Sequence, residues 1–139
     1  MTAKLHIRRL ILYTGMIGFS IIFLFYIIGC TWIGYEVKAT CRQAQTEYSG
    51  DCVEALSSLL LDNNRGFKLR NSAAWALGQL GDIRALPALQ QQYTGFIPDR
   101  EPLNEMISQY ELQKAINLVN GGTNISAWLW RDQRLTGLQ

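Results

Sequence analysis

Residues 69–89 read LRNSAAWALGQLGDIRALPAL, and this stretch predicts two consecutive helices joined by a sharp turn. Apolar residues recur at i, i+4, i+7, i+8 and i+11, which places them on one face of a helix from about Phe67 to Leu80: Leu69, Ala73, Ala76, Leu77 and Leu80. Gly81 can adopt the left-handed conformation that ends a helix, and Asp82 can cap the next one. That second helix is expected to bury Ile83, Leu86 and Leu89 on one face.

The same stretch resembles a HEAT-like repeat of the subtype also found in phycobilisome lyases. The shared features are a basic residue, an alanine-rich helix that ends Leu-Gly-x-Leu-Gly-Asp, and the sequence Ala-x-Pro-Ala-Leu over residues 85–89. Each feature has a physical reason: small alanines let two helices approach closely, and Pro87 lies in the first turns of its helix, where a missing N–H costs least. The resemblance implies an interaction scaffold and names no partner.

On both sides of this hairpin the pattern stays helical. Asp51 can cap a helix that carries Val53, Leu56, Leu59 and Leu60 and ends at residues 63–64. After a loop over residues 93–102, another helix is expected from Leu103 to Val119. The last helix, after Thr123 or Asn124, would carry Ile125, Trp128 and Leu129. Self-similarity at offsets of 39 and 30 residues indicates degenerate repeats.

Residues 10–35 hold no charged side chain and are apolar on every face. As a helix they would span about 39 Å, more than the roughly 30 Å of a hydrocarbon core, so they predict a transmembrane helix. Arg8 and Arg9 precede this span, and the positive-inside rule therefore places residues 1–9 in the cytoplasm and residues 36–139 outside it, in the periplasm or on the outer face. Trp32 and Tyr35 are expected at the membrane interface. The predicted fold is all-α: one N-terminal transmembrane helix followed by a short α-solenoid of about three HEAT-like helical hairpins.

The N-terminal segment also permits another interpretation. Residues 27–30, Ile-Ile-Gly-Cys, resemble a bacterial lipoprotein signal, in which Cys30 would be lipidated after cleavage. The apolar run continues past Cys30, which favours an uncleaved anchor. Both interpretations leave the domain tethered outside.

Cys41 and Cys52 are the two cysteines of the predicted outer domain and form a disulfide candidate. Two straight helices meeting at a tight turn near residues 49–50 would hold the two cysteines too far apart for a bond. A disulfide therefore requires the first helix to stop near Gln45, with residues 46–51 forming a loop. Two unpaired buried thiols remain the alternative.

Large aromatic side chains off the apolar face are candidates for contact with a partner protein. Trp75 lies roughly 150° from the centre of the apolar face of its helix at 100° per residue. Trp128 fits the buried face of the last helix, whereas Trp130 does not. Trp75, Trp130 and the basic Arg84 are the candidate partner-contact residues. The alternative for both tryptophans is that they pack along their own solenoid or lie singly on the surface.

Charge and residue inventory exclude several classes of function. Three of the thirteen Lys and Arg residues precede the span, so ten face all eleven acidic residues and the outer domain carries about −1; it lacks a basic face for nucleic acid. The lone histidine, His6, lies before the span, and we expect no catalytic set, metal site, cofactor or small-molecule substrate. Glu101, Glu105 and Glu111 are interpreted as a solvated helix face.

The predicted function is a non-catalytic accessory or scaffold subunit of a larger membrane protein complex. Its partners would be other membrane subunits and the lipid bilayer. The alternative is a free-standing adaptor, tethered by the uncleaved helix or as a lipoprotein, that binds a soluble protein or peptide.

Overall fold

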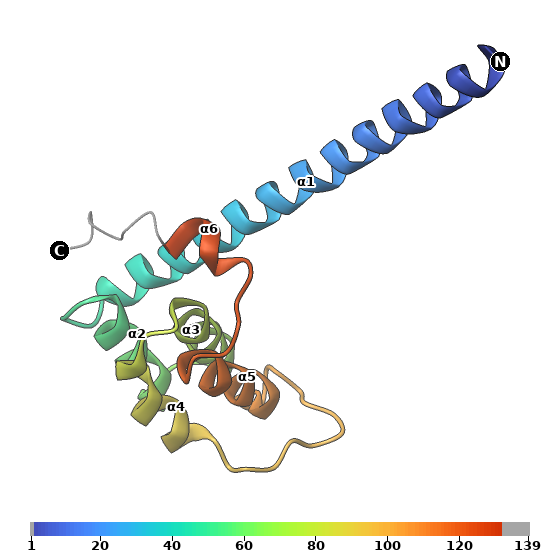
Figure 1. The fold of residues 1–139 in the computed structure, drawn as a ribbon. Coiled ribbons are helices and arrows are strands. Elements are labelled where there is room, and N and C mark those ends of the chain that lie inside the picture. Colours follow the sequence, from blue (N-terminus) through green and yellow to red (C-terminus); the bar gives the residue numbers. More distant parts are fainter. Residues whose placement is uncertain (1, 132–139) are drawn as a thin grey trace.

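The computed structural model describes residues 2–131, and every regular element among them is helical. In chain order these elements are α1 (Thr2–Gln45), α2 (Cys52–Leu61), α3 (Phe67–Leu80), a 3-10 turn η1 (Ile83–Ala85), α4 (Leu86–Gln92), α5 (Gln109–Val119) and α6 (Ala127–Arg131). One long helix leads into a group of short ones that gather around its C-terminal part (Figure 1). The all-α fold with a short helical repeat is confirmed.

Helix α1 is a single rod of 44 residues that serves two purposes. It is long and apolar enough to cross a membrane, with a mean hydropathy of 2.2 over its most apolar window. Beyond the predicted span it continues without interruption as the first helix of the repeat domain. Its buried face begins inside the predicted span, at Cys30, and consists of small or medium residues spaced three or four apart: Cys30, Gly34, Val37, Cys41 and Ala44. Such a face lets neighbouring helices pack closely.

Local capping sets the ends of α2 and α3. Asp51 accepts hydrogen bonds from the backbone of Val53 and Glu54, and the Glu54 side chain accepts one from the Asp51 N–H, which completes a capping box. Helix α3 has the predicted bounds. Gly81 ends it in the left-handed conformation with φ of 64°, and Asp82 caps the following turn.

The element after Asp82 differs from the expectation. It is a 3-10 turn followed by the short helix α4, with Pro87 in its first turn. The tighter turn changes the register, so Ile83 is 59% exposed and the buried residues are Ala85, Ala88 and Leu89. The prediction that Ile83 faces the core is therefore wrong.

Helix α5 starts six residues later than predicted. Residues 103–108 form a turn and loop, and the Ser108 hydroxyl accepts the N–H of Glu111 as the cap of a helix that begins at Gln109. Leu112, Ala115 and Val119 then face the core as the periodicity predicts. The later start follows from side chains elsewhere in the fold that hold residues 103–108 outside the helix, as described below.

Helices α3 and α5 touch through their smallest residues. Gly78 is buried, and a Cβ atom built there would lie 2.7 Å from Ala115 Cα. The neighbouring Ala73, Ala74 and Ala76 are fully buried in the core. Close approach through glycine and alanine is therefore how this repeat packs.

Helix α6 does not pair with α5 as the second half of a hairpin. The chain leaves α5 at Asn120 and returns to α1, and α6 packs beside α1 (Figure 1). The Tyr26 hydroxyl donates a hydrogen bond of 3.1 Å to the Ile125 carbonyl across 99 positions of sequence. The last helical segment thereby covers α1 and closes the repeat onto its own first helix.

Candidate interaction surfaces

The part of the chain that the structure describes contains no group of three or more His, Cys, Asp or Glu side chains that could hold a metal ion. The candidate sites that the sequence indicates are surfaces, and their shape depends on what holds the helices in place.

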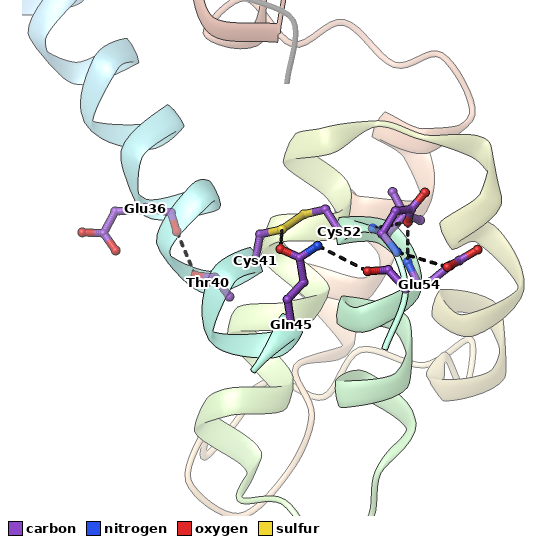
Figure 2. Close-up of a disulfide and its surroundings, with 9 residues drawn as sticks. Glu36, Thr40, Cys41, Gln45, Cys52 and Glu54 are labelled. Carbon is purple, nitrogen blue, oxygen red and sulfur yellow. Dashed lines mark hydrogen bonds between the residues drawn. A yellow bond between two sulfur atoms is a disulfide. The ribbon is translucent and has the colours of Figure 1, made fainter. Parts of the chain in front are cut away.

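The Cys41–Cys52 disulfide joins α1 to α2 (Figure 2). Helix α1 stops at Gln45 and residues 46–51 form a loop, which is the condition that the sequence set for this bond. The two Cα atoms lie 5.3 Å apart, within the range that a disulfide requires. The Gln45 side-chain amide also donates to the Gly50 carbonyl, at 3.3 Å, and steadies the loop. The repeat domain is thus covalently fastened to the long helix.

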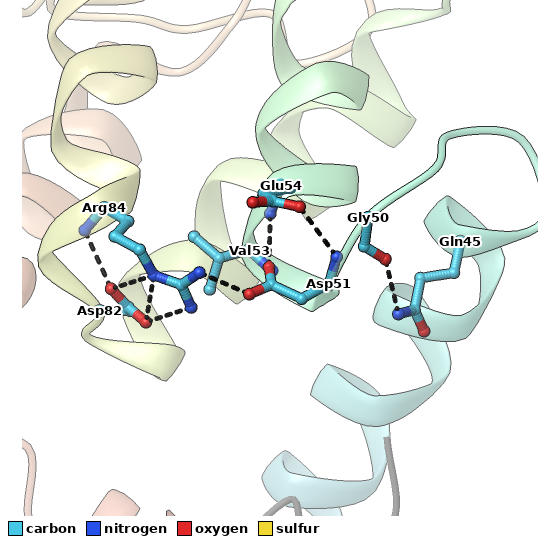
Figure 3. A network of polar contacts seen from close by, with 7 residues as sticks. All are labelled: Gln45, Gly50, Asp51, Val53, Glu54, Asp82 and Arg84. Carbon is cyan, nitrogen blue, oxygen red and sulfur yellow. Dashed lines mark hydrogen bonds and ion pairs between the residues drawn. The ribbon is translucent and has the colours of Figure 1, made fainter. Parts of the chain in front are cut away.

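Arg84 links two helix caps within the chain (Figure 3). Its guanidinium forms ion pairs with Asp82 at 2.8 Å and with Asp51 at 2.5 Å. Hydrogen bonds from Arg84 lower the pKa of Asp82. For Asp51, burial acts to raise the pKa, but hydrogen bonds from the Glu54 N–H and from Arg84 outweigh it and the pKa falls. Arg84 therefore stabilises the contact between two helix caps. Its side chain is still half-exposed, and its contact with a partner protein stays a prediction.

Arg70 is a structural residue to which the sequence analysis assigned no role of its own. It is 5% exposed, and its Nε donates to the Leu60 carbonyl at 2.8 Å, while an Nη atom donates to the Gln92 side chain at 3.1 Å. The C-terminal end of α2 is thereby satisfied by a buried cation from α3. Burial lowers the pKa of Arg70. The sequence signal for this role was the basic residue that the HEAT-like repeat pattern places at the start of its first helix, which is Arg70 here.

A cleft of about 320 Å³ opens on the outer side of α3 and α5. Its walls come from α3, the loop before α5 and α5 itself: Lys68, Asn71, Ser72, Trp75, Leu103 and Glu111. Trp75 is half-buried and packs partly against the core, so it is neither fully covered nor free. Leu103 is 51% exposed at the rim. Its exposed area is mainly apolar, and Lys68 and Glu111 contribute one cation and one carboxylate to its lining.

Asn71 fixes the loop that forms one wall of this cleft. Its side-chain nitrogen donates to the carbonyls of Leu103 and Met106, both at 3.1 Å, and its oxygen accepts the Ser108 N–H at 2.8 Å. Three backbone groups of the loop thus bond to one side chain of α3 and do not form the hydrogen bonds of a helix. The position of Leu103 is in this way set by α3.

Glu101 belongs to the same loop and corrects the interpretation of the acidic residues. Its carboxylate accepts the N–H groups of Gln109 and Tyr110 and the hydroxyl of Ser108. It therefore neutralises the N-terminal end of α5, where a negative charge is favourable. Glu101 and Glu105 both precede α5, so only Glu111 lies on that helix.

Trp130 is the second correction. It is 5% exposed, and a Cβ built at Gly34 would lie 2.9 Å from its Cβ and Cγ atoms, so its side chain packs directly on α1. The buried face of α6 is decided by α1 and not by the repeat, which is why the helical periodicity misjudged it. A covered ring presents no surface to a partner. The side chain of Trp128 lies outside the described residues.

The membrane-facing candidates all lie on α1. Trp32 and Tyr35 are 68% and 69% exposed and line an apolar cleft of about 430 Å³ together with Ile27, Ile28 and Thr31. Arg8 and Arg9 are exposed near the start of the helix. Cys30, the lipidation candidate, lies within the continuous helix and is 3% exposed.

Comparison with known proteins matches residues 69–92 to the PBS lyase HEAT-like repeat. This match confirms the resemblance over that segment, which comprises most of α3 together with η1 and α4. No curated protein and no solved structure matches the chain. HEAT-like repeats are helical scaffolds typical of protein–protein interaction, so the segment indicates an interaction domain.

Proposed function

We propose that this chain is a non-catalytic accessory subunit of a membrane protein complex. In this proposal α1 anchors it with residues 1–9 in the cytoplasm, and the repeat domain projects from the opposite face to contact a neighbouring subunit. The observation that carries the proposal is that one continuous helix is both the apolar rod and the first helix of the repeat. A rigid junction of this kind holds the repeat at a fixed height and orientation, which a docking subunit needs and a flexible tether lacks.

The junction is reinforced where it leaves the span. The disulfide fastens α2 to α1, and the buried face from Cys30 to Ala44 is covered by other helices. In the lipoprotein alternative Cys30 would be the first residue of the chain. The uncleaved anchor is supported instead by the burial of Cys30 between Tyr26 and Gly34, two positions at which α1 meets the C-terminal segment.

The cleft beside Trp75 is the surface that we assign to the partner subunit. Its exposed area is mainly apolar, one wall belongs to the segment that matches the HEAT-like repeat, and the bonds of Asn71 to the loop hold the opposite wall in place. A photo-crosslinking amino acid placed at Leu103 tests this, with Ile83 as the matched control, because both side chains are more than half exposed and Ile83 lies outside the cleft.

Crosslinking would be done in native membranes and followed by size-exclusion chromatography in mild detergent. We expect one defined membrane partner crosslinked from position 103 and not from position 83, in a complex of fixed stoichiometry. A monomer in mild detergent that gives equal crosslinking from both positions would contradict the subunit proposal and favour the free-standing adaptor.

A further inference from the structure

The bare part of α1 has a defined length. From Leu10 to Gly29 the side chains are exposed around the whole helix, apart from the half-buried Ile27. These twenty residues measure about 30 Å at 1.5 Å per residue, which equals the thickness of a bilayer hydrocarbon core. The covered part begins at Cys30. The repeat domain thus starts where the hydrocarbon core would end.

The C-terminal segment reaches below this level. The Tyr26 hydroxyl bonds to the Ile125 carbonyl, and Tyr26 lies four residues, or about 6 Å, before Cys30 on the same face of α1. On the other side of Cys30, Trp130 packs on Gly34. The chain between Ile125 and Trp130 therefore runs along α1 across the predicted boundary between acyl chains and headgroups.

The composition of this segment suits that depth. No charged residue occurs from Ala115 to Trp130, a run of sixteen residues. Ile125 is 69% exposed and precedes α6. Its nearest polar neighbours are paired internally, because Asn124 donates to Gln79 at 2.8 Å and the Ser126 hydroxyl donates to Asn124 at 2.7 Å. An apolar side chain is therefore exposed while the side-chain amide of Asn124 and the hydroxyl of Ser126 beside it are hydrogen-bonded, which lowers the cost of placing them at the edge of a low-dielectric layer.

We propose that residues 124–130 form a second membrane contact, with the Ile125 side chain inserted at the boundary between acyl chains and headgroups beside Tyr26. The inference rests on the proposed membrane anchoring by α1. Two contacts at different positions around α1 fix the rotation of the repeat domain about the helix axis. Trp32 and Tyr35, which are exposed on α1, lie about 9 and 14 Å beyond Tyr26 along the helix, on the headgroup side, and fit an aromatic belt there.

Nitroxide depth measurement tests the proposal. The full chain, with Cys30→Ala to leave no free thiol, would be labelled at Ile125→Cys and reconstituted in phosphatidylcholine liposomes. Two isoleucines supply matched references: Ile22→Cys, 70% exposed on the bare helix, and Ile83→Cys, 59% exposed between Asp82 and Arg84. Collision with oxygen, which concentrates in lipid, is compared with collision with a water-soluble nickel chelate.

We expect position 125 to favour oxygen over nickel at least several-fold more than position 83 does, and to report a depth between those of positions 83 and 22. Tyr26→Phe, which removes the hydroxyl that holds the segment, should move the label at position 125 toward the aqueous value. If position 125 matches position 83 while position 22 remains in lipid, the insertion is refuted and the anchor stands. If position 22 is also aqueous, both the anchor and the insertion are refuted.

Discussion

Replacing Gly78 by alanine has two opposing effects on the stability of the fold, and their magnitudes decide whether it rises or falls. Inside a helix, alanine is favoured over glycine by about 1 kcal/mol. The new methyl carbon, however, would lie 2.7 Å from Ala115 Cα and 2.8 Å from its Cβ, where carbon atoms prefer about 3.5–4.0 Å. The neighbouring atom belongs to the backbone of α5, so the two helices must separate by about 1 Å. Overpacking of this kind costs about 1–3 kcal/mol, and we place Gly78→Ala near the upper end, for a net destabilisation of about 1–2 kcal/mol.

The measurement is thermal unfolding of the full chain in lipid nanodiscs, followed by near-ultraviolet circular dichroism. A loss of 1–2 kcal/mol lowers the Tm of a domain of this size by roughly 4–16 °C. The control is Ser72→Ala on the same helix, where the hydroxyl bonds only to the exposed Lys68 carbonyl, so stability should change by less than about 0.5 kcal/mol. A higher Tm for Gly78→Ala would show that helix propensity dominates and that α3 and α5 are not in close contact.

Three further predictions follow from the bonds that hold the repeat together. Replacing both Cys41 and Cys52 by serine should lower the free energy of unfolding by about 3 kcal/mol, which is the chain-entropy value for a closed loop of roughly a dozen residues. Denaturant titration measures this, and an equal unfolding midpoint with and without reductant for the natural sequence would contradict it. Arg70→Met should cost about 1–3 kcal/mol, because it removes the buried donor to the Leu60 carbonyl near the end of α2, and an unchanged denaturation midpoint would refute that role. The pKa of Asp82 is lowered in the folded state, so the unfolded chain binds more protons in acid and stability should be lost as the pH falls below about 4. Arg84→Gln should weaken this pH dependence of the free energy of unfolding. Equal pH profiles for the two proteins would count against the ion pair.

Local sequence signals predicted the helices whose ends are set by their own neighbours. The bounds of α3 follow from its periodicity and from Gly81, and the start of α2 from the cap at Asp51. The glycine–proline pattern also identified the repeat that the family comparison matched. In these cases the deciding contacts lie within a few residues along the chain, where capping and periodicity act.

The mistakes occur where a distant segment decides the local structure. Helix α5 starts late because Asn71 and Glu101 take the backbone groups that would otherwise extend it. Trp130 is buried because α6 packs on α1, and no periodicity within five residues can indicate which face that will be. The disulfide could be predicted only on the condition that α1 ends near Gln45, because local sequence signals did not determine the length of the loop between the two cysteines.

By itself, the sequence determined an apolar helix long enough to cross a bilayer and a run of amphipathic helices that cannot bury their faces alone. Only the tertiary structure decided how the run ends, with its last segment returned to the first helix at Tyr26 and Gly34. The reason is physical: helix formation depends on neighbours three or four residues away, whereas the return of α6 depends on a face of small residues on α1 nearly one hundred positions earlier. That face becomes a binding surface for α6 only when the repeat between them has folded.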